Sequence, residues 1–231
     1  MARRERQRVT GLPVHIIQRG NNRQACFYAE ADYQFFLHHL SELAKRFKCE
    51  LHAYVLMTNH VHLLLTPYLV RGPSLLMKLL GQRYVQYINK TYRRSGTLWD
   101  GRFRSCLVQD SRYVLACYRY IERNPVRANM VNHPIEYPWS SYATNATGKS
   151  LPWLTPHGEY LGLASDGDKR QAAYRGLFES ELDQQLLRAI RVSTHGGYAI
   201  GSSRFREEIK CALKLRATAR GPGRAAAEAG L

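Results

Sequence analysis

Zinc-type cysteine pairs and long apolar runs are both missing from this chain of 231 residues. Its five cysteines are odd in number and lie far apart, at Cys26, Cys49, Cys106, Cys117 and Cys211. No two have the spacing of a zinc site, so we expect free thiols in a reducing compartment. No run approaches the length of a transmembrane helix, and the basic start leads into no apolar signal core. We therefore expect a cytoplasmic protein with no membrane partner.

Acidic residues are scarce relative to basic ones. Asp and Glu number 18 against 34 Lys and Arg, which gives a formal net charge of +16. Such an excess favours a polyanionic partner, of which nucleic acid is the commonest; a solvated basic surface with no partner is the alternative. The rest of the composition is ordinary for a globular protein, and the length suffices for one core and an appendage.

Hydrophobic periodicity divides the first half of the chain into strands and helices. We predict strands at residues 12–18, 49–57, 60–66 and within 102–109, and helices at 32–47, 73–92 and 111–123, the last capped by Asp110. Up to the fourth strand, this is the order of a ferredoxin-like fold. The sequence thus predicts an α+β protein whose antiparallel sheet carries helices on one face and leaves the other face free to hold a site.

The pattern changes after residue 131. Residues 134–142 are rich in loop formers, 143–169 look irregular, 171–191 have helical spacing, and 205–216 form a short basic helix. We therefore predict a first domain at 1–145, a basic helical extension at 146–216 and a Gly-rich tail at 217–231, which we expect to be disordered.

The most informative strand begins His60-Val61-His62. Side chains alternate between faces along a strand, so the two histidines point the same way. Two imidazoles on a rigid strand make half of a site for a divalent metal ion. The alternative is a half-buried strand in which two polar side chains are satisfied by neighbours.

A second group of residues lies on the predicted helix at 111–123. Tyr120 and Asn124 are four residues apart and share a face, whereas Tyr118 points elsewhere, into the core. Pro125 biases Asn124 away from helical geometry, so this pairing is approximate. A tyrosine hydroxyl can attack phosphorus and hold it covalently, and an Asn carbonyl can complete a metal site beside two histidines. The sequence shows no obvious base for the tyrosine.

Basic residues near these segments are candidates for DNA binding. The turn with Arg19, Asn21 and Arg23 has Gly and Asn suited to positive φ and could hold a phosphate, although a plain turn explains it as well. The other candidates are Arg83 on a helix, Arg102 and Arg104 on one strand face, Arg127, and Arg204 and Arg206 on the last helix.

These residues resemble a known family. His60-Val61-His62 matches the motif of the HUH superfamily of single-tyrosine DNA nucleases. Residues 98–103 (LWDGRF), 120–128 (YIERNPVRA) and 137–142 (YPWSSY) look like the transposases of small insertion sequences, and more narrowly like the REP-associated tyrosine transposases of bacteria. The resemblance covers residues 10–145 and, more weakly, the basic segment to 216.

The resemblance implies a ferredoxin-like fold and cleavage of single-stranded DNA near a folded hairpin with Mg²⁺ or Mn²⁺. By matching position, His60 and His62 would be metal ligands, Tyr120 the nucleophile and Asn124 the third ligand, where many mobile-element relatives carry Gln. Paired relatives exchange the tyrosine helix between subunits. Here the C-terminal segment could cover that surface, so a monomer and a homodimer both stay open.

We therefore predict a metal-dependent endonuclease and strand transferase that acts on hairpin DNA through a 5′-phosphotyrosine. The alternative is a ferredoxin-like module that binds hairpin DNA or RNA without cutting it. Such a module would expose aromatic side chains on its central strands, and this central strand offers His60 and His62 instead. A domesticated relative that binds but no longer turns over is a third possibility.

Overall fold

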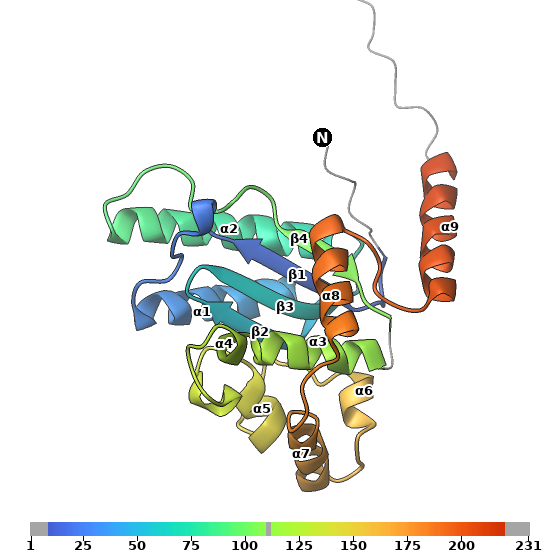
Figure 1. The fold of residues 1–231 in the computed structure, drawn as a ribbon. Helices are drawn as coiled ribbons and strands as arrows, with labels where there is room; N and C mark the ends of the chain where they lie inside the picture. Colours follow the sequence, from blue (N-terminus) through green and yellow to red (C-terminus); the bar gives the residue numbers. More distant parts are fainter. Residues whose placement is uncertain (1–8, 110–111, 220–231) are drawn as a thin grey trace, which may run out of the picture.

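The computed structural model describes residues 9–109 and 112–219 of the chain. Four strands form one antiparallel sheet in the order β2-β3-β1-β4 (Figure 1). The strands are β1 (Val14–Arg19), β2 (Cys49–Met57), β3 (His60–Pro67) and β4 (Arg104–Leu107). This order confirms the predicted ferredoxin-like α+β fold.

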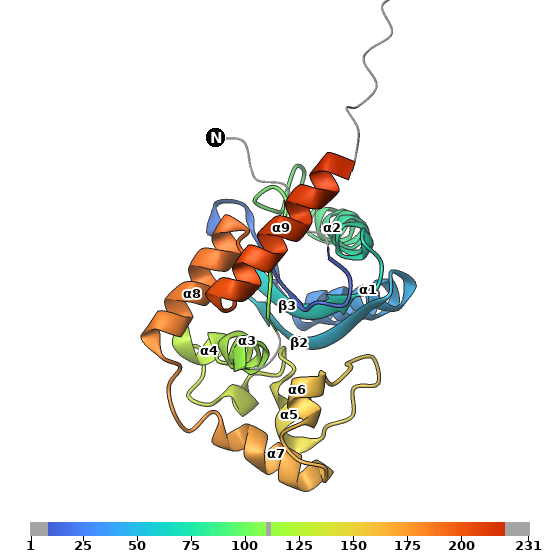
Figure 2. The same cartoon turned by 90° about the vertical axis from the view of Figure 1, so that its right-hand side faces the viewer.

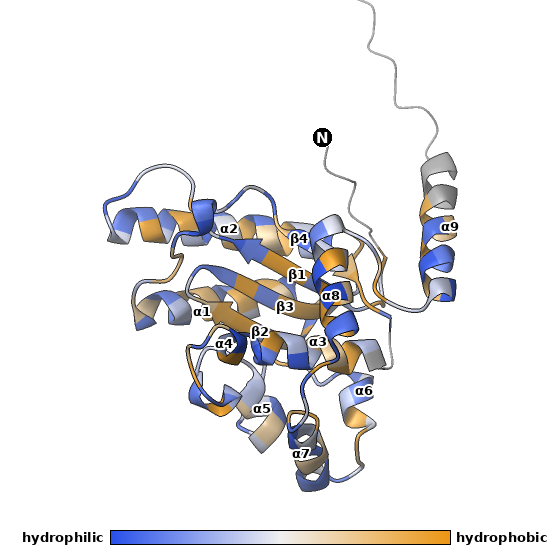
Figure 3. Ribbon diagram, in the orientation of Figure 1, coloured by the Kyte–Doolittle hydropathy of each residue, from blue (hydrophilic) through white to orange (hydrophobic). Residues whose placement is uncertain are grey.

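Two helices, α1 (Glu30–Arg46) and α2 (Gly72–Thr91), cover one face of the sheet, as predicted (Figure 2). Their apolar stripes, which include Phe36 and Leu80, pack with Ile16 and Leu63 of the sheet in one core. In Figure 3 the hydrophobic colours gather on the strands, and outlying helices such as α9 are largely hydrophilic.

The opposite face of the sheet is covered as well, which corrects the expectation that it is free. Helix α3 (Arg112–Glu122) lies across β2 and β3, and α8 (Gln184–Gly196) lies over β4 and β1 (Figure 2). The buried stripe of α3 explains its docking, because burying Val114, Tyr118 and Ile121 removes apolar surface from water. A site on this face must therefore lie between the sheet and its covering helices.

The C-terminal half is more helical than the sequence suggested. After the short α4 (Asn124–Arg127) come α5 (Tyr142–Thr147), α6 (Gly158–Leu161), α7 (Gly167–Gly176), α8 and α9 (Ser203–Ala219). Helices of four to six residues carry too little periodicity to be recognised within the segment 143–169. Asp110 and residues 220–231 lie outside the described residues. None of the helices in the described ranges is long and apolar enough to cross a bilayer.

The single helix predicted at 171–191 is wrong, because the chain breaks between α7 and α8. The carboxylate of Asp183 caps α8 by accepting from the Gln185 N–H at 3.1 Å. Between the helices, the Ser180 carbonyl accepts hydrogen bonds from the guanidinium groups of Arg119 and Arg123 on the α3 side. The break thus docks the extension onto α3, which apolar spacing alone does not reveal.

A buried carboxylate also joins α3 to the extension. Glu122 accepts hydrogen bonds from Ser141 Oγ at 2.5 Å, Asn145 Nδ2 at 2.7 Å and the Tyr174 hydroxyl at 2.6 Å. Burial raises the pKa of this carboxyl to about 7, against the opposing effect of these hydrogen bonds. Residues before and after position 145 therefore share one core. The division into domains at that position stays a prediction.

Candidate active site

His60 and His62 lie on the face of β3 that α3 covers, and Tyr120 of α3 lies against them. The His60 and His62 ring centroids are 5.1 Å apart, and those of His62 and Tyr120 are 5.6 Å apart. The structure thus brings together three residues that the sequence singled out. It adds His15 of β1, whose ring centroid is 5.1 Å from that of His62 and 5.7 Å from that of Tyr120.

A chain of hydrogen bonds fixes which nitrogen of His62 carries the proton. Thr194 Oγ1 on α8 donates to the Ile190 carbonyl at 2.7 Å, so its oxygen accepts from His15 Nδ1 at 2.9 Å. A neutral His15 then has only Nε2 as an acceptor, and it receives the proton of His62 Nδ1 at 2.9 Å. The lone pair of His62 is therefore on Nε2.

The same reasoning applies to His60. Asn59 donates from Nδ2 to the Arg23 carbonyl at 3.1 Å, which places its Oδ1 toward His60 Nδ1 at 2.6 Å. The carbonyl oxygen can only accept, so His60 carries its proton on Nδ1 and its lone pair on Nε2. The predicted turn at residues 19–23 thus has a role in orienting His60. Its positive φ values fall on Asn22, one of the expected asparagines, and on Arg23, whereas Gly20 has a φ of −63°.

Burial keeps all three imidazoles neutral near pH 7. It lowers the pKa of His15 to about 3 and that of His60 to about 4, and it places the pKa of His62 well below its usual value. Nearby arginines add to the effect, Arg127 for all three and Arg19 for the pair on β3. His60 and His62 are then neutral, and each keeps an Nε2 lone pair, which is what a divalent cation requires. These two residues therefore fit such an ion, whereas the Nε2 of His15 is already paired with His62.

Asn124 is less clearly part of this group. Helix α3 ends at Glu122, and Asn124 is the buried first residue of α4. Its backbone carbonyl accepts from the Ala128 N–H at 3.0 Å, and within the described ranges no hydrogen bond joins its amide to the histidines. The four-residue spacing from Tyr120 therefore spans a break between two helices. Its assignment as a metal ligand stays a prediction.

Arg127 packs on the tyrosine. Its Cζ is 4.2 Å from the centroid of the Tyr120 ring, and its Nη1 is buried without a partner among the described residues. Burial lowers the pKa of this guanidinium to about 10, so it stays charged at pH 7. Arg127, Arg123 of the α3–α4 junction and Arg191 of α8 line a cavity of about 450 Å³. Glu181 also lines the cavity, so it combines three guanidinium groups with one carboxylate next to the Arg127 that packs on Tyr120.

Three other arginines that were predicted to bind DNA lie together at the β1 and β4 end of the same sheet face. Arg19, Arg102 and Arg104 line a small recess together with Asp100 and His195. Arg19 lies opposite His60 in the β1–β3 register, and Arg104 Nη1 is 2.9 Å from His195 Nδ1. The recess is therefore suited to contact the phosphates of a nucleic-acid strand that leads to the histidines.

The remaining basic candidates lie elsewhere. Arg83 is on the α1–α2 side, where its Nη1 is 2.7 Å from Glu42 Oε2 and 3.1 Å from His39 Nδ1. His38, His39 and Glu42 are close enough to hold a cation, but the Arg83 guanidinium already occupies their neighbourhood. Arg204 and Arg206 are exposed on α9.

The sequence missed His15 and Thr194. His15, Ile17 and Arg19 point to the same face of β1. Only the β1–β3 register, which pairs Ile17 with His62, shows that His15 lies close to His62. Thr194 is 179 residues from His15, and no local pattern connects the two.

Comparisons with known proteins identify a family and support the fold. A family model described as "Transposase IS200 like" matches residues 8–124, just over half of the chain. A solved structure of a REP-associated tyrosine transposase bound to a REP hairpin is similar over 69% of this chain and 93% of its own, with a TM-score of 0.56 and 17% identity, which supports the fold. A candidate transposase from Deinococcus radiodurans R1 is 22% identical over 56% of this chain and 98% of its own, with a TM-score of 0.35. No curated protein matches the chain.

Proposed function

Because the chain belongs to the IS200-like transposase family, we propose that it is a divalent-metal-dependent endonuclease and strand transferase for single-stranded DNA beside a hairpin. The observation that carries the proposal is the position of Tyr120, whose ring contacts both the histidine group and the Arg127 guanidinium. The hairpin is proposed because the similar REP-associated transposase is bound to one.

In the proposed reaction the Tyr120 hydroxyl oxygen attacks the phosphorus of the scissile phosphodiester. The bond to the 3′ oxygen breaks, that oxygen leaves as a free 3′ hydroxyl, and the 5′ phosphate stays on the tyrosine. A 3′ hydroxyl of a second strand reverses these events, joins the two strands and releases Tyr120. The covalent intermediate conserves the energy of the bond, which strand transfer needs.

The surrounding residues supply binding and electrostatics. The Arg127 guanidinium packs on Tyr120 with its Nη1 unpartnered among the described residues, and it would stabilise negative charge that develops on the phosphoryl oxygens. His60 and His62 would hold Mg²⁺ or Mn²⁺ through Nε2, and a bound ion there would act as a Lewis acid on a phosphate oxygen. Imidazole nitrogen suits Mn²⁺ better than Mg²⁺, which prefers oxygen ligands.

The test is Tyr120→Phe, which removes one oxygen and keeps the ring that packs on His15, His62 and Arg127. We expect cleavage of a labelled hairpin substrate to stop and the covalent adduct on a denaturing gel to vanish, with hairpin affinity retained. Tyr118→Phe is the matched control, because its hydroxyl instead accepts from the His157 N–H at 3.3 Å.

In the wild type, mass spectrometry should place the adduct on the peptide that contains Tyr120. Cleavage without an adduct at any tyrosine would point to a water nucleophile and remove strand transfer from the proposal. Binding without any cleavage would favour the alternative of a non-catalytic hairpin-binding module.

A further inference from the structure

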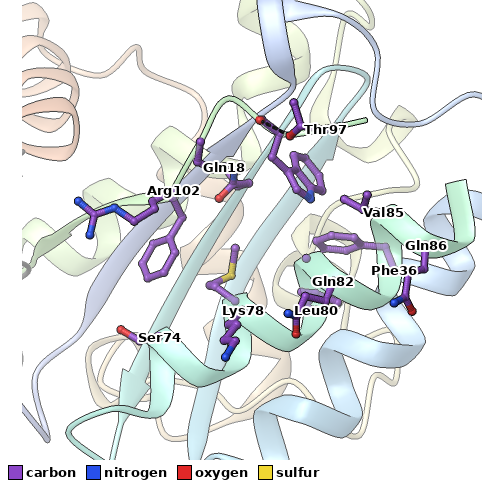
Figure 4. Close-up of a pocket in the computed structure, with 15 residues that line it drawn as sticks. Gln18, Phe36, Ser74, Lys78, Leu80, Gln82, Val85, Gln86, Thr97 and Arg102 are labelled. Atoms are coloured by element: carbon purple, nitrogen blue, oxygen red, sulfur yellow. Dashed lines mark hydrogen bonds between the residues drawn. The ribbon is translucent and has the colours of Figure 1, made fainter. Parts of the chain in front are cut away.

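A cleft of about 630 Å³ opens beside α2, on the face of the sheet opposite Tyr120. Its lining comes from α2, from the end of β1, from residues 97–103 and from Phe36 of α1 (Figure 4). We refer to it as the α2 cleft. Its volume is within the range of 300–1,000 Å³ that is typical of small-molecule sites. The proposed cleavage reaction makes no use of it.

Two parallel rows of α2 residues give the cleft an apolar floor and a polar rim. Residues four apart lie in line on a helix. The inner row consists of Met77, Gly81 and Val85, and the outer row of Ser74, Lys78, Gln82 and Gln86 (Figure 4). The cleft thus combines apolar contact area with amide, hydroxyl and ammonium groups along one edge.

A buried donor points into this cleft. The indole of Trp99 is 92% buried, and its Nε1 has no hydrogen-bond partner among the described residues. Its N–H edge faces Gly81, where an added Cβ would lie 3.7 Å from Nε1 and 3.8 Å from Cδ1. The missing side chain of Gly81 therefore leaves only the helix backbone beside the donor, and Nε1 itself is closed to water, so a ligand would reach it by shifting the indole slightly. An unpaired buried N–H is unfavourable, so a ligand with an acceptor edge would gain by pairing with it.

Trp99 is held firmly in this position. Two backbone hydrogen bonds fix the residues on either side of it. The Asp100 N–H donates to the Arg19 carbonyl at 2.8 Å, and the Asn21 N–H donates to the Leu98 carbonyl at 2.9 Å. Gln18 Nε2 donates to the Gly101 carbonyl at 3.0 Å, and the indole ring stacks on Tyr84 with centroids 5.8 Å apart. Binding would therefore cost little ordering of the indole.

We propose that the α2 cleft binds an unpaired nucleobase of the single-stranded DNA substrate. A base has an apolar face for the floor and acceptor atoms at its edge for the Trp99 N–H, and the glutamine amides can contact the rest of that edge. Lys78 supplies positive charge at the rim for the phosphates. The choice of DNA rests on the proposed function.

The strand has a continuous route from this cleft to the catalytic residues. Arg102 lines both the α2 cleft and the recess that holds Arg19 and Arg104. Arg19 in turn lies opposite His60. A base in the cleft would thus fix the register of a strand whose next nucleotides pass the recess, which gives a means of choosing the cleavage position.

Indole N–H signals give a direct test. The ¹⁵N-labelled full chain has three tryptophans, and Trp99→Phe assigns the signal of Trp99. In EDTA, where cleavage should be blocked, tetranucleotides of dA, dC and dT and one mixed sequence containing dG are added. We expect at least one to shift the Trp99 signal and to leave those of Trp139 and Trp153 in place. An abasic tetramer with the same number of phosphates should leave all three unmoved.

A filled cleft provides the second measurement. Gly81→Met should weaken binding of the base-containing tetramer about tenfold, the scale of one lost base contact, and leave the weak binding of the abasic tetramer unchanged. Gly81→Ala should fold at least as well as wild type, because a Cβ at 3.7 Å is an ordinary contact and alanine favours the helix. Gln34→Met on exposed α1 is the matched control and should have no effect.

Three results would overturn the inference. They are a Trp99 signal that stays fixed at saturating tetranucleotide, an equal shift with the abasic strand, and equal losses for Gly81→Met and Gln34→Met. Cleavage is assayed separately on the hairpin substrate. Base binding without cleavage would remove the proposed function and keep this inference. Cleavage without any base binding in the α2 cleft would keep the proposed function and remove this inference.

Discussion

Thr194 controls the orientation of His62 without touching it. Its hydroxyl accepts from His15, and His15 accepts from His62, so the Nε2 lone pair of His62 faces the site only while both bonds hold. Partners of this kind commonly change metal affinity by 10–100-fold when they are removed.

We therefore predict that Thr194→Val, which keeps the shape and loses the acceptor, weakens Mn²⁺ binding by about 10–100-fold. Thr194→Ser should keep the Mn²⁺ affinity of the wild type. His62→Ala, which removes a ligand, should show the weakest Mn²⁺ binding of the series. Mn²⁺ affinity is measured by electron paramagnetic resonance on protein that circular dichroism shows to be folded. Unchanged affinity in Thr194→Val would mean that the tautomer of His62 does not depend on α8.

Glu122 is a residue whose protonation affects the fold as a whole. Burial raises its pKa to about 7 from a usual value near 4.5. Between these values the folded protein keeps a proton that the unfolded chain has lost, so this residue's contribution to stability falls as pH rises from 4.5 to 7 and then levels off.

Glu122→Gln removes this titration. Its free energy of unfolding should therefore rise relative to wild type between pH 5 and pH 8, by roughly 3 kcal/mol. The comparison between the two proteins cancels the opposite contribution of the buried histidines, whose pKa values are lowered. Urea unfolding of both proteins at pH 5 and at pH 8, the two values compared above, measures this difference in free energy of unfolding. Parallel curves for the two proteins would show that Glu122 titrates normally.

Among the elements, the first half of the chain was largely predictable and the second was not. The hairpin of β2 and β3 and helices α1 and α2 have strong periodicity and lie within two residues of their predicted bounds. The single helix predicted at 171–191 is wrong because the chain breaks where the Ser180 carbonyl binds Arg119 and Arg123 and where Asp183 caps α8. In the site, His60, His62 and Tyr120 came from local motifs, whereas His15 and Thr194 depend on register and tertiary packing.

The last helix, α9, was predicted to bind DNA, and its charges are not equivalent. Arg204 Nε is 2.8 Å from Glu208 Oε1, which partly neutralises it, while Arg206 contacts only the Ser203 hydroxyl among the described residues. Deleting the helix would be a poor test, because Phe205 and Ile209 are buried in the core.

We predict instead that Arg206→Gln lowers the slope of log affinity against log salt by about 0.7–0.9, the value for one phosphate contact. Arg204→Gln should lower it less. Fluorescence anisotropy with a labelled hairpin between 50 and 300 mM KCl, as a rough working range, gives the slopes. Arg83→Gln, whose guanidinium is paired with Glu42, is the control. Equal slopes in all variants would place α9 outside the DNA interface.

At the scale of the whole molecule, the candidate site residues that the structure brings together all come from one chain. Tyr120 meets His15 and His62 of its own sheet, and α8 covers the neighbouring surface of α3. Exchange of the tyrosine helix with a second copy is therefore unnecessary for assembling these groups.

We predict a monomer of 26.6 kDa in light scattering without DNA. A mixture of Tyr120→Phe and His62→Ala proteins should stay inactive, because neither chain carries a complete site. Recovery of cleavage in the mixture would show that Tyr120 acts on the histidines of a second chain and would support the homodimer.

The 179 residues between His15 and Thr194 also have a consequence for protein synthesis. The histidine pair and Tyr120 leave the ribosome well before α8 does, so a nascent chain carries the reactive groups before it carries the helix that orients them. Full affinity for the metal ion would then appear only after α8 has been synthesised and has packed onto the sheet. Ribosome-bound chains stalled before residue 184 should bind Mn²⁺ weakly, and chains released after residue 219 should bind it fully.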